Sequence, residues 1–181
     1  MLACPMQGTD FADEAALLAA CRRHDVRAFE ELYNAHAPRL KSIAWHILGN
    51  RPDAEDAVHE AFLKAYRAIG GFHGVSGIGT WLCRIVINVS YDLQRKRQCE
   101  GDSGETLANE RSSGNQALGL LLRDALRRIH PRHRMVFLLF EVEGLRHAEI
   151  AAVLEIAEGT SKAWLFEAKK ELKRLLTEAR R

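Results

Sequence analysis

A polar stripe of cations and an amide runs along one predicted helix, over residues 81–97. The stripe recurs at steps of four, three and four residues, so its members share one helical face. It consists of Arg84, Asn88, Tyr91 and Arg95, and the helix ends in further bases at Lys96 and Arg97. Guanidinium groups bind phosphates, and Asn and Arg side chains read base edges. The stripe therefore predicts a helix that lies on nucleic acid, with an ordinary solvated face as the alternative.

A short helix, a turn and a longer basic helix follow one another near the end of the chain. Residues 147–154 form the short helix, Gly159 closes the turn, and the long helix runs from Thr160 to about Leu176. This order is typical of the helix-turn-helix, whose second helix enters the DNA major groove. A plain helical hairpin is the alternative. The predicted buried side of the long helix is Ser161, Leu165, Ala168, Leu172 and Leu175.

Motifs of enzymes and metal sites are missing from the sequence. Four cysteines form no C-x-x-C pair, and His130 and His133 have no cysteine or carboxylate at ligand spacing. The glycine-rich segment 70–79 is predicted to be a loop, but Thr80 follows it where a phosphate-binding loop would carry lysine. We therefore expect no enzyme, no metal and no cofactor, and we expect Thr80 to cap the next helix.

The composition is that of a folded globular protein with only α-helices. Of 181 residues, 47% are apolar and 28% are charged, and the apolar residues fall at helical spacing without β-type alternation. No apolar run is long enough to span a membrane, and the first residues lack the pattern of a signal peptide. These features predict an all-α protein that works in the cytoplasm.

Charge divides the chain into segments. Residues 21–97 carry 12 bases against 8 acids and residues 119–181 carry 13 against 9, whereas residues 98–118 carry 4 acids and 1 base. The acidic middle is poor in large apolar residues and is expected to stay flexible. The predicted organisation is an acidic, disordered N-terminal segment (1–20), a helical domain (21–97), a linker (98–117) and a second helical domain (118–181).

An acidic ridge is predicted on a helix that starts at Asp53. Small and large apolar residues recur at steps of three and four along this helix, which gives it a buried side. The opposite, polar side carries Asp53, Asp56, His59 and Glu60.

Four stretches taken in order resemble the extracytoplasmic-function sigma factors, the smallest members of the bacterial sigma-70 family. They are DAEDAVHEAF at 53–62, TWLCRIVIN at 80–88, EGLRHAEIA at 143–151 and EGTSK at 158–162. The resemblance runs from about Asp25 to Leu176. It implies two helical domains on a flexible linker that bind core RNA polymerase, direct it to promoters and help melt them. Such factors are typically held inactive by an anti-sigma protein, often one bound to the membrane.

The resemblance also implies three groups of site residues. The polymerase would contact Asp53, Asp56, His59 and Glu60, where His59 replaces the usual glutamine. Single-stranded minus-10 DNA would contact Phe72, His73, Trp81, Arg84, Asn88, Tyr91, Arg95 and Lys96. The duplex minus-35 element would contact Arg146, Glu158, Thr160, Lys162, Ala163, Phe166 and Lys169.

Two residues of the long helix depart from the family pattern. Trp164 and Glu167 stand where arginines are common. Losing two cations and gaining an acid should weaken the attraction for phosphates. The alternative function is a DNA-binding regulator that uses the helix-turn-helix without polymerase. Such a protein usually needs a dimer, and the chain shows no heptad dimerisation helix.

Overall fold

The computed structural model describes residues 11–74, 77–100 and 116–179, and all regular elements in these ranges are helices. The helices form two compact units, one containing the elements up to residue 100 and the other those from residue 116 onward. The prediction of an all-α fold with two helical domains is confirmed. Most of the predicted linker lies outside the described residues.

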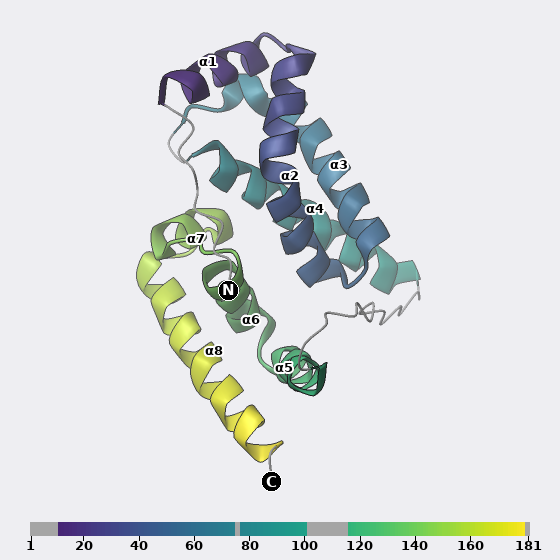
Figure 1. Ribbon diagram of the computed structural model, residues 1–181, viewed down its shortest axis with the longest axis vertical. Helices are drawn as coiled ribbons and strands as arrows, with labels where there is room; N and C mark the ends of the chain where they lie inside the picture. The colour runs from purple at the N-terminus through teal and green to yellow at the C-terminus, as the bar shows by residue number, and fades with distance from the viewer. Residues whose placement is uncertain (1–10, 75–76, 101–115, 180–181) are drawn as a thin grey trace. The chain divides into compact units, whose positions relative to one another are not determined.

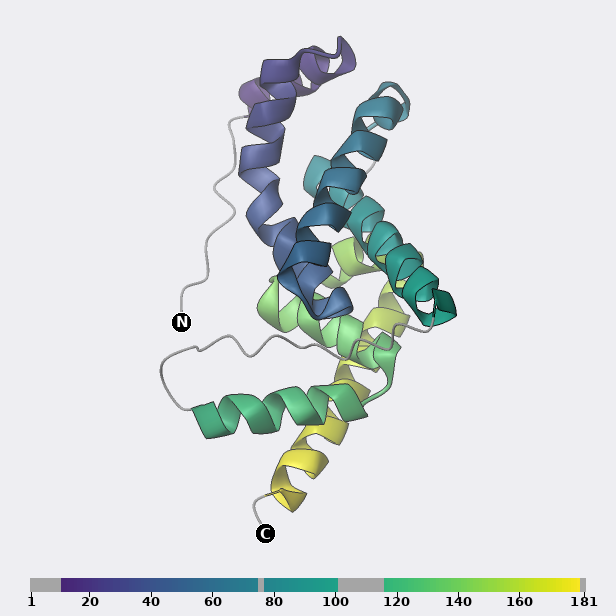
Figure 2. The ribbon, with the colours of Figure 1, turned by 90° about the vertical axis from the view of Figure 1, so that its right-hand side faces the viewer.

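The first unit is a bundle of three long helices with a fourth packed on it (Figures 1 and 2). Its elements are α1 (Phe11–Arg22), α2 (Val26–Leu48), α3 (Arg51–Ala68), the 3-10 turn η1 (Ile69–Gly71) and α4 (Ile78–Glu100). Helices α2, α3 and α4 all contact one another, and α1 packs on α2 and η1. The prediction of a disordered tail is wrong for the end of the N-terminal segment, which is helical from Phe11. Cys4 lies outside the described residues.

Apolar stripes at helical spacing build the core of this unit. Five of the most deeply buried side chains come from the three helices that contact one another, and all five are at most 2% exposed: Leu32, Leu40 and Ile43 of α2, Val58 of α3 and Leu82 of α4. Burying such a side chain contributes about 1.5–3 kcal/mol relative to leaving it exposed. The core therefore fixes which face of α3 and α4 remains outside.

Two helix starts differ from the prediction because of local capping. Helix α3 begins at Arg51, since Asn50 is its N-cap and accepts a hydrogen bond of 2.9 Å from the Asp53 N–H. Helix α4 begins at Ile78, and the Trp81 N–H donates to the Gly77 carbonyl at 3.1 Å. Thr80 is therefore inside the helix, where it is 9% exposed, and it is not the cap.

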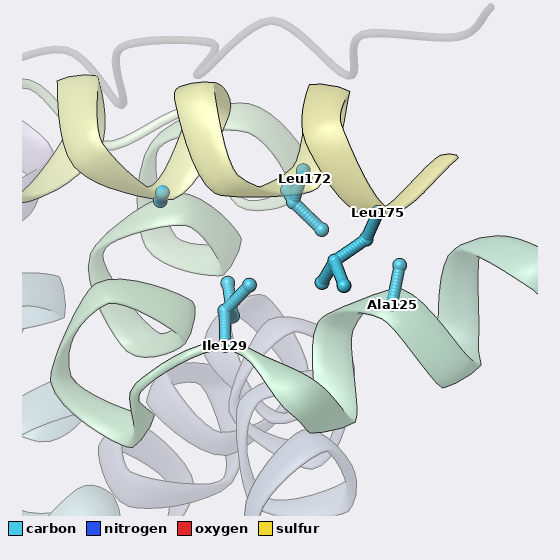
Figure 3. Packing of buried hydrophobic residues seen from close by; sticks show 5 residues of the cluster. Ala125, Ile129, Leu172 and Leu175 are labelled. Atoms are coloured by element: carbon cyan, nitrogen blue, oxygen red, sulfur yellow. The ribbon is translucent and has the colours of Figure 1, made fainter. Parts of the chain in front are cut away.

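The second unit packs a long helix, α8, against three shorter helices. Its elements are α5 (Gln116–Arg128), α6 (Pro131–Phe137), the π-helical turn η2 (Leu138–Val142), α7 (His147–Leu154) and α8 (Glu158–Glu178). Leu172 and Leu175 of α8 point toward Ala125 of α5 and toward Ile129, which follows α5 (Figure 3). The predicted buried side of α8 is confirmed, because all five of its residues are at most 7% exposed.

Candidate nucleic-acid and partner surfaces

The polar stripe of α4 lies on the outside of the first unit. Arg84, Asn88 and Arg95 are exposed and Tyr91 is half-buried, whereas Val86 on the opposite side is fully buried. The exposed Lys96 extends the stripe, and Arg95 forms an ion pair with Asp92 one turn earlier. The helix therefore presents cations and an amide side by side, as the sequence predicts.

Phe72 does not lie on this surface. Its side chain is 5% exposed, and its ring centroid is 5.1 Å from that of the half-buried Trp81. A ring buried in this way cannot stack on a base, so the expectation that Phe72 contacts DNA is wrong for this conformation. His73, the next residue, is exposed, and Trp81 keeps part of its surface outside.

A histidine lies beneath the first turn of α4. A Cβ atom added to Gly79 would come 3.1 Å from Cε1 of His36, so the imidazole of α2 packs closely on the α4 backbone. Burial lowers the pKa of His36, and the nearby charge of Arg39 lowers this pKa further. The site therefore favours the neutral imidazole.

Helix α3 carries the acidic ridge, but Asp53, one of the four predicted residues, is not open to a partner. Asp56 and His59 are exposed and Glu60 is half-buried. Asp53 is instead held by the unit itself, through an ion pair with Arg97 of α4 and a hydrogen bond from the Asn50 amide. Its side chain is only 15% exposed, so the expectation that Asp53 belongs to a free binding ridge is wrong.

The histidine of the ridge rests on an aromatic ring. His59 and Tyr33 stack with an interplanar angle of 6° and centroids 6.0 Å apart. The Tyr33 hydroxyl lies 3.5 Å from Nε2 of His59. This contact fixes the imidazole on the ridge beside Asp56 and Glu60.

Helices α7 and α8 form a helix-turn-helix within the second unit (Figure 1). Helix α7 ends at Leu154, and Glu155 takes the left-handed conformation with φ 54° that turns the chain. Nδ1 of His147 on α7 lies 3.0 Å from the buried Ser161 hydroxyl on α8. Helix α8 starts at Glu158, two residues before the predicted Thr160.

The outer face of α8 mixes one large apolar side chain with charges. Phe166 is 66% exposed, and Lys162 pairs with Glu158 at 2.7 Å. A hydrogen bond from the Lys162 ammonium, together with its charge, holds the pKa of Glu158 below its ordinary value. Ala163 is exposed as well, and Thr160 is half-buried. The outer face of α8 therefore presents the ring of Phe166 and the ammonium of Lys162, which is ion-paired with Glu158.

Lys169 and Arg146 are two further exposed cations of this unit. The Lys169 ammonium is 2.6 Å from a Glu141 carboxylate oxygen of η2 and 5.8 Å from the ring centroid of Phe140. An exposed pair of this kind contributes at most about 1 kcal/mol, so a phosphate can replace the carboxylate. Arg146 is exposed just before α7, where its backbone N–H donates to Glu149 at 2.8 Å.

Comparison with known proteins identifies the family. Sigma-70 region 2 matches residues 32–99 and sigma-70 region 4 matches residues 119–172. The ECF RNA polymerase sigma factor SigM of Mycobacterium tuberculosis is 30% identical over 90% of this chain and 84% of its own length. This chain belongs to the ECF sigma factors. Each matched region falls within one of the two helical units of the fold.

Two solved structures share the fold. CnrH, in complex with the cytosolic domain of CnrY, is 25% identical with a TM-score of 0.72, covering 91% of this chain and 97% of CnrH. The sigma factor RpoE of Bartonella quintana, in complex with the anti-sigma factor NepR, is 26% identical with a TM-score of 0.67, covering 84% of this chain and 98% of RpoE.

This sigma factor has a cation beside Trp164, a contact that no sequence pattern predicts. The Arg132 guanidinium on α6 lies 5.7 Å from the Trp164 ring centroid on α8, and the His133 ring is 6.2 Å from the same indole. The sequence signals only that Trp164 replaces a common arginine. The contact itself depends on how α6 packs on α8.

The parts of this sigma factor that the structure describes contain no group of three or more His, Cys, Asp or Glu side chains placed to hold a metal ion. Within the same residues, no helix is long and apolar enough to cross a membrane. The side chains of Cys21 and Cys83 are buried thiols, and that of Cys99 is an exposed thiol. Burial is the main cause that raises the pKa of Cys21, and the nearby charges of Asp25 and Glu31 raise it further.

Proposed function

We propose that this ECF sigma factor binds bacterial core RNA polymerase and uses its two units to recognise the two elements of a promoter. The observation that carries the proposal is the pairing, in one chain, of an outward polar stripe on α4 with a helix-turn-helix whose second helix has an open outer face. It would act as a transcription initiation factor and not as an enzyme. Because polymerase and genome share the bacterial cytoplasm, we place its action there.

The polymerase surface would be the ridge of Asp56, His59 and Glu60 on α3. Carboxylates that face a basic partner speed the encounter and fix the register of docking. His59, which lies between Asp56 and Glu60 in sequence, stacks on Tyr33. Its imidazole can donate a hydrogen bond to the polymerase or accept one from it. Asp53 would support this surface by tying the start of α3 to α4.

The first unit would hold the minus-10 element as a single strand. Arg84 and Asn88 would contact phosphates and bases, supported by Tyr91, Arg95 and Lys96. The exposed His73 and the free surface of Trp81 would supply stacking faces for an unpaired base.

The second unit would read the minus-35 element as a duplex. Lys162, Ala163 and Phe166 would face the major groove from α8, where Phe166 can contact a thymine methyl group. Four further residues at the margin of this face would complete the contacts: Arg146, Glu158, Thr160 and Lys169.

An anti-sigma protein would regulate this factor. The relative from Bartonella quintana was solved with its anti-sigma factor NepR, and its similarity to this chain extends over both units. We expect the partner to cover the α3 ridge or the DNA surfaces and so to shift the population away from the polymerase-bound state. The partner can itself be a membrane protein, whereas no insertion of the sigma factor into the membrane is proposed.

Mixing the purified protein with bacterial core RNA polymerase tests the proposal. Co-elution in gel filtration, followed by defined transcript starts from a pool of genomic fragments, is the expected result and yields the promoter sequence. Co-elution without any transcript would limit the function to polymerase binding. Tight binding of duplex DNA by the protein alone, without co-elution, would overturn the proposal in favour of a DNA-binding regulator that acts without polymerase.

A further inference from the structure

The last residue of α1 reaches the loop that follows α3. Nη2 of Arg22 donates a hydrogen bond of 2.8 Å to the backbone carbonyl of Phe72, across 50 positions of sequence and in a partly buried site. Helix α1 also contacts η1, the turn that leads into Phe72. Arg22 is thus a direct link between the N-terminal helix and the start of the glycine-rich loop.

Phe72 is fixed by three contacts of different kinds. Its carbonyl accepts from Arg22, its N–H donates to the Ile69 carbonyl at 3.1 Å, and its ring packs on Trp81 of α4. The pairing of Phe72 with Trp81 joins the two ends of the loop. A backbone held on both sides in this way sets the position of the exposed His73 that follows directly.

Arg22 is itself held in place. Cys21 before it is fully buried, and two backbone hydrogen bonds close the end of α1, from Arg23 to Ala20 at 3.0 Å and from His24 to Cys21 at 2.9 Å. His24 takes a left-handed conformation with φ 61°, and its ring packs on Tyr66 with centroids 4.6 Å apart. The base of the Arg22 side chain therefore cannot drift away from the loop without disturbing this turn.

We infer that Arg22 is a positioning residue for minus-10 recognition: it holds the Phe72 carbonyl so that His73 and the Trp81 face are presented to the unpaired strand. This inference rests on the proposed function. It gives α1 a part in promoter opening, although α1 carries none of the DNA-contacting side chains.

The test compares Arg22→Ala with Arg23→Ala in the full-length protein. Arg23 is the next residue and carries the same charge, and both arginines are exposed, so it controls for the loss of one cation. Each holoenzyme is titrated with a short fluorescein-labelled single strand that carries the minus-10 sequence mapped with the wild-type protein. Affinity for core polymerase and the melting temperature are measured in parallel. Hydrogen exchange of the Phe72 amide is followed in the free protein.

Arg22→Ala should lower the affinity for the single strand about fivefold and speed exchange of the Phe72 amide by a similar factor, the effect of losing one hydrogen bond. Affinity for core polymerase should stay unchanged in Arg22→Ala. Arg23→Ala should change neither the affinity for the single strand nor the exchange of the Phe72 amide. Arg22→Lys should recover part of the affinity for the single strand. Equal effects of the two alanine variants would overturn the inference. So would a parallel loss of polymerase affinity, because that would report general destabilisation.

Failure of the proposed function gives a different pattern. If the wild-type holoenzyme gave no transcript start from which a minus-10 sequence could be mapped, or did not bind the mapped single strand, the proposed function would be wrong, whereas the exchange measurement in the free protein would still show whether Arg22 holds Phe72. If the wild type bound the strand and Arg22→Ala left both its affinity and the exchange of Phe72 unchanged, only the positioning role would be wrong.

Discussion

Asp53 at the start of α3 and Arg97 near the end of α4 form an ion pair across the first unit. Since α3 carries the acidic ridge and α4 the polar stripe, the pair links the two helices that we assign to polymerase and DNA. Asp53→Ala should lower the free energy of unfolding by about 1–2 kcal/mol, because it removes a largely shielded pair and part of the Asn50 capping network. Urea denaturation of the full-length protein measures this loss.

A double-mutant cycle separates the pair from its surroundings. Asp53→Ala and Arg97→Ala should couple by about 1 kcal/mol. Arg95→Ala, which removes an exposed pair with Asp92 on the same helix, should cost less and show no coupling to Asp53. Additive losses for Asp53 and Arg97 would contradict an energetic link between α3 and α4.

The remaining ridge can be tested without disturbing the fold. Asp56→Arg combined with Glu60→Arg should weaken binding to core polymerase by about tenfold or more, since two carboxylates that face a basic partner become cations. Glu55→Arg is a single-site control, compared with each single reversal: it reverses an exposed acid of α3 whose Oε1 lies 3.7 Å from Nζ of Lys41 on α2. Fluorescence anisotropy measures the affinity for core polymerase. If the affinity fell by the same factor in Glu55→Arg as in each single reversal of Asp56 or Glu60, a general charge effect would explain the result.

Periodicity predicts the helices and their buried sides in this protein, because burial repeats with the helical turn. The wrong expectations concern residues whose position depends on partners far away in sequence. Phe72 sits in a glycine-rich segment and was expected outside, yet Arg22 and Trp81 hold it in. Asp53 was expected on the ridge, and Arg97, 44 positions later, turns it inward. No local pattern carries these contacts.

The stripe on α4 should act after polymerase has bound. Arg84→Ala or Asn88→Ala should reduce open-complex formation about tenfold, the effect of losing one good base or phosphate contact, while polymerase affinity persists. Permanganate reactivity of unpaired thymines measures opening. Arg67→Ala, which removes an exposed cation at the end of α3, should leave opening unchanged. Normal opening in both stripe variants would remove α4 from the DNA surface.

Restoring a cation on α8 should strengthen minus-35 binding. Trp164→Arg adds a positive charge beside Arg132 on the reading unit, so the plot of log affinity against log salt should steepen by about 0.9. Ala179→Arg adds the same charge at the far end of α8 and should leave the slope unchanged. Titration of the duplex promoter at several salt concentrations measures both. An equal change in the two variants would show that only net charge matters.

His36 makes the first unit sensitive to acid. Its folded-state pKa is lowered by burial and then by Arg39, so below the ordinary value near 6.5 the unfolded chain binds the proton more readily than the folded one. Stability that is present above that value should therefore fall as the pH drops from about 7 toward 5. Urea denaturation should show this slope reduced in His36→Gln but not in His73→Gln, which changes an exposed histidine. An identical slope in the wild type and His36→Gln would mean that other groups cause the acid sensitivity.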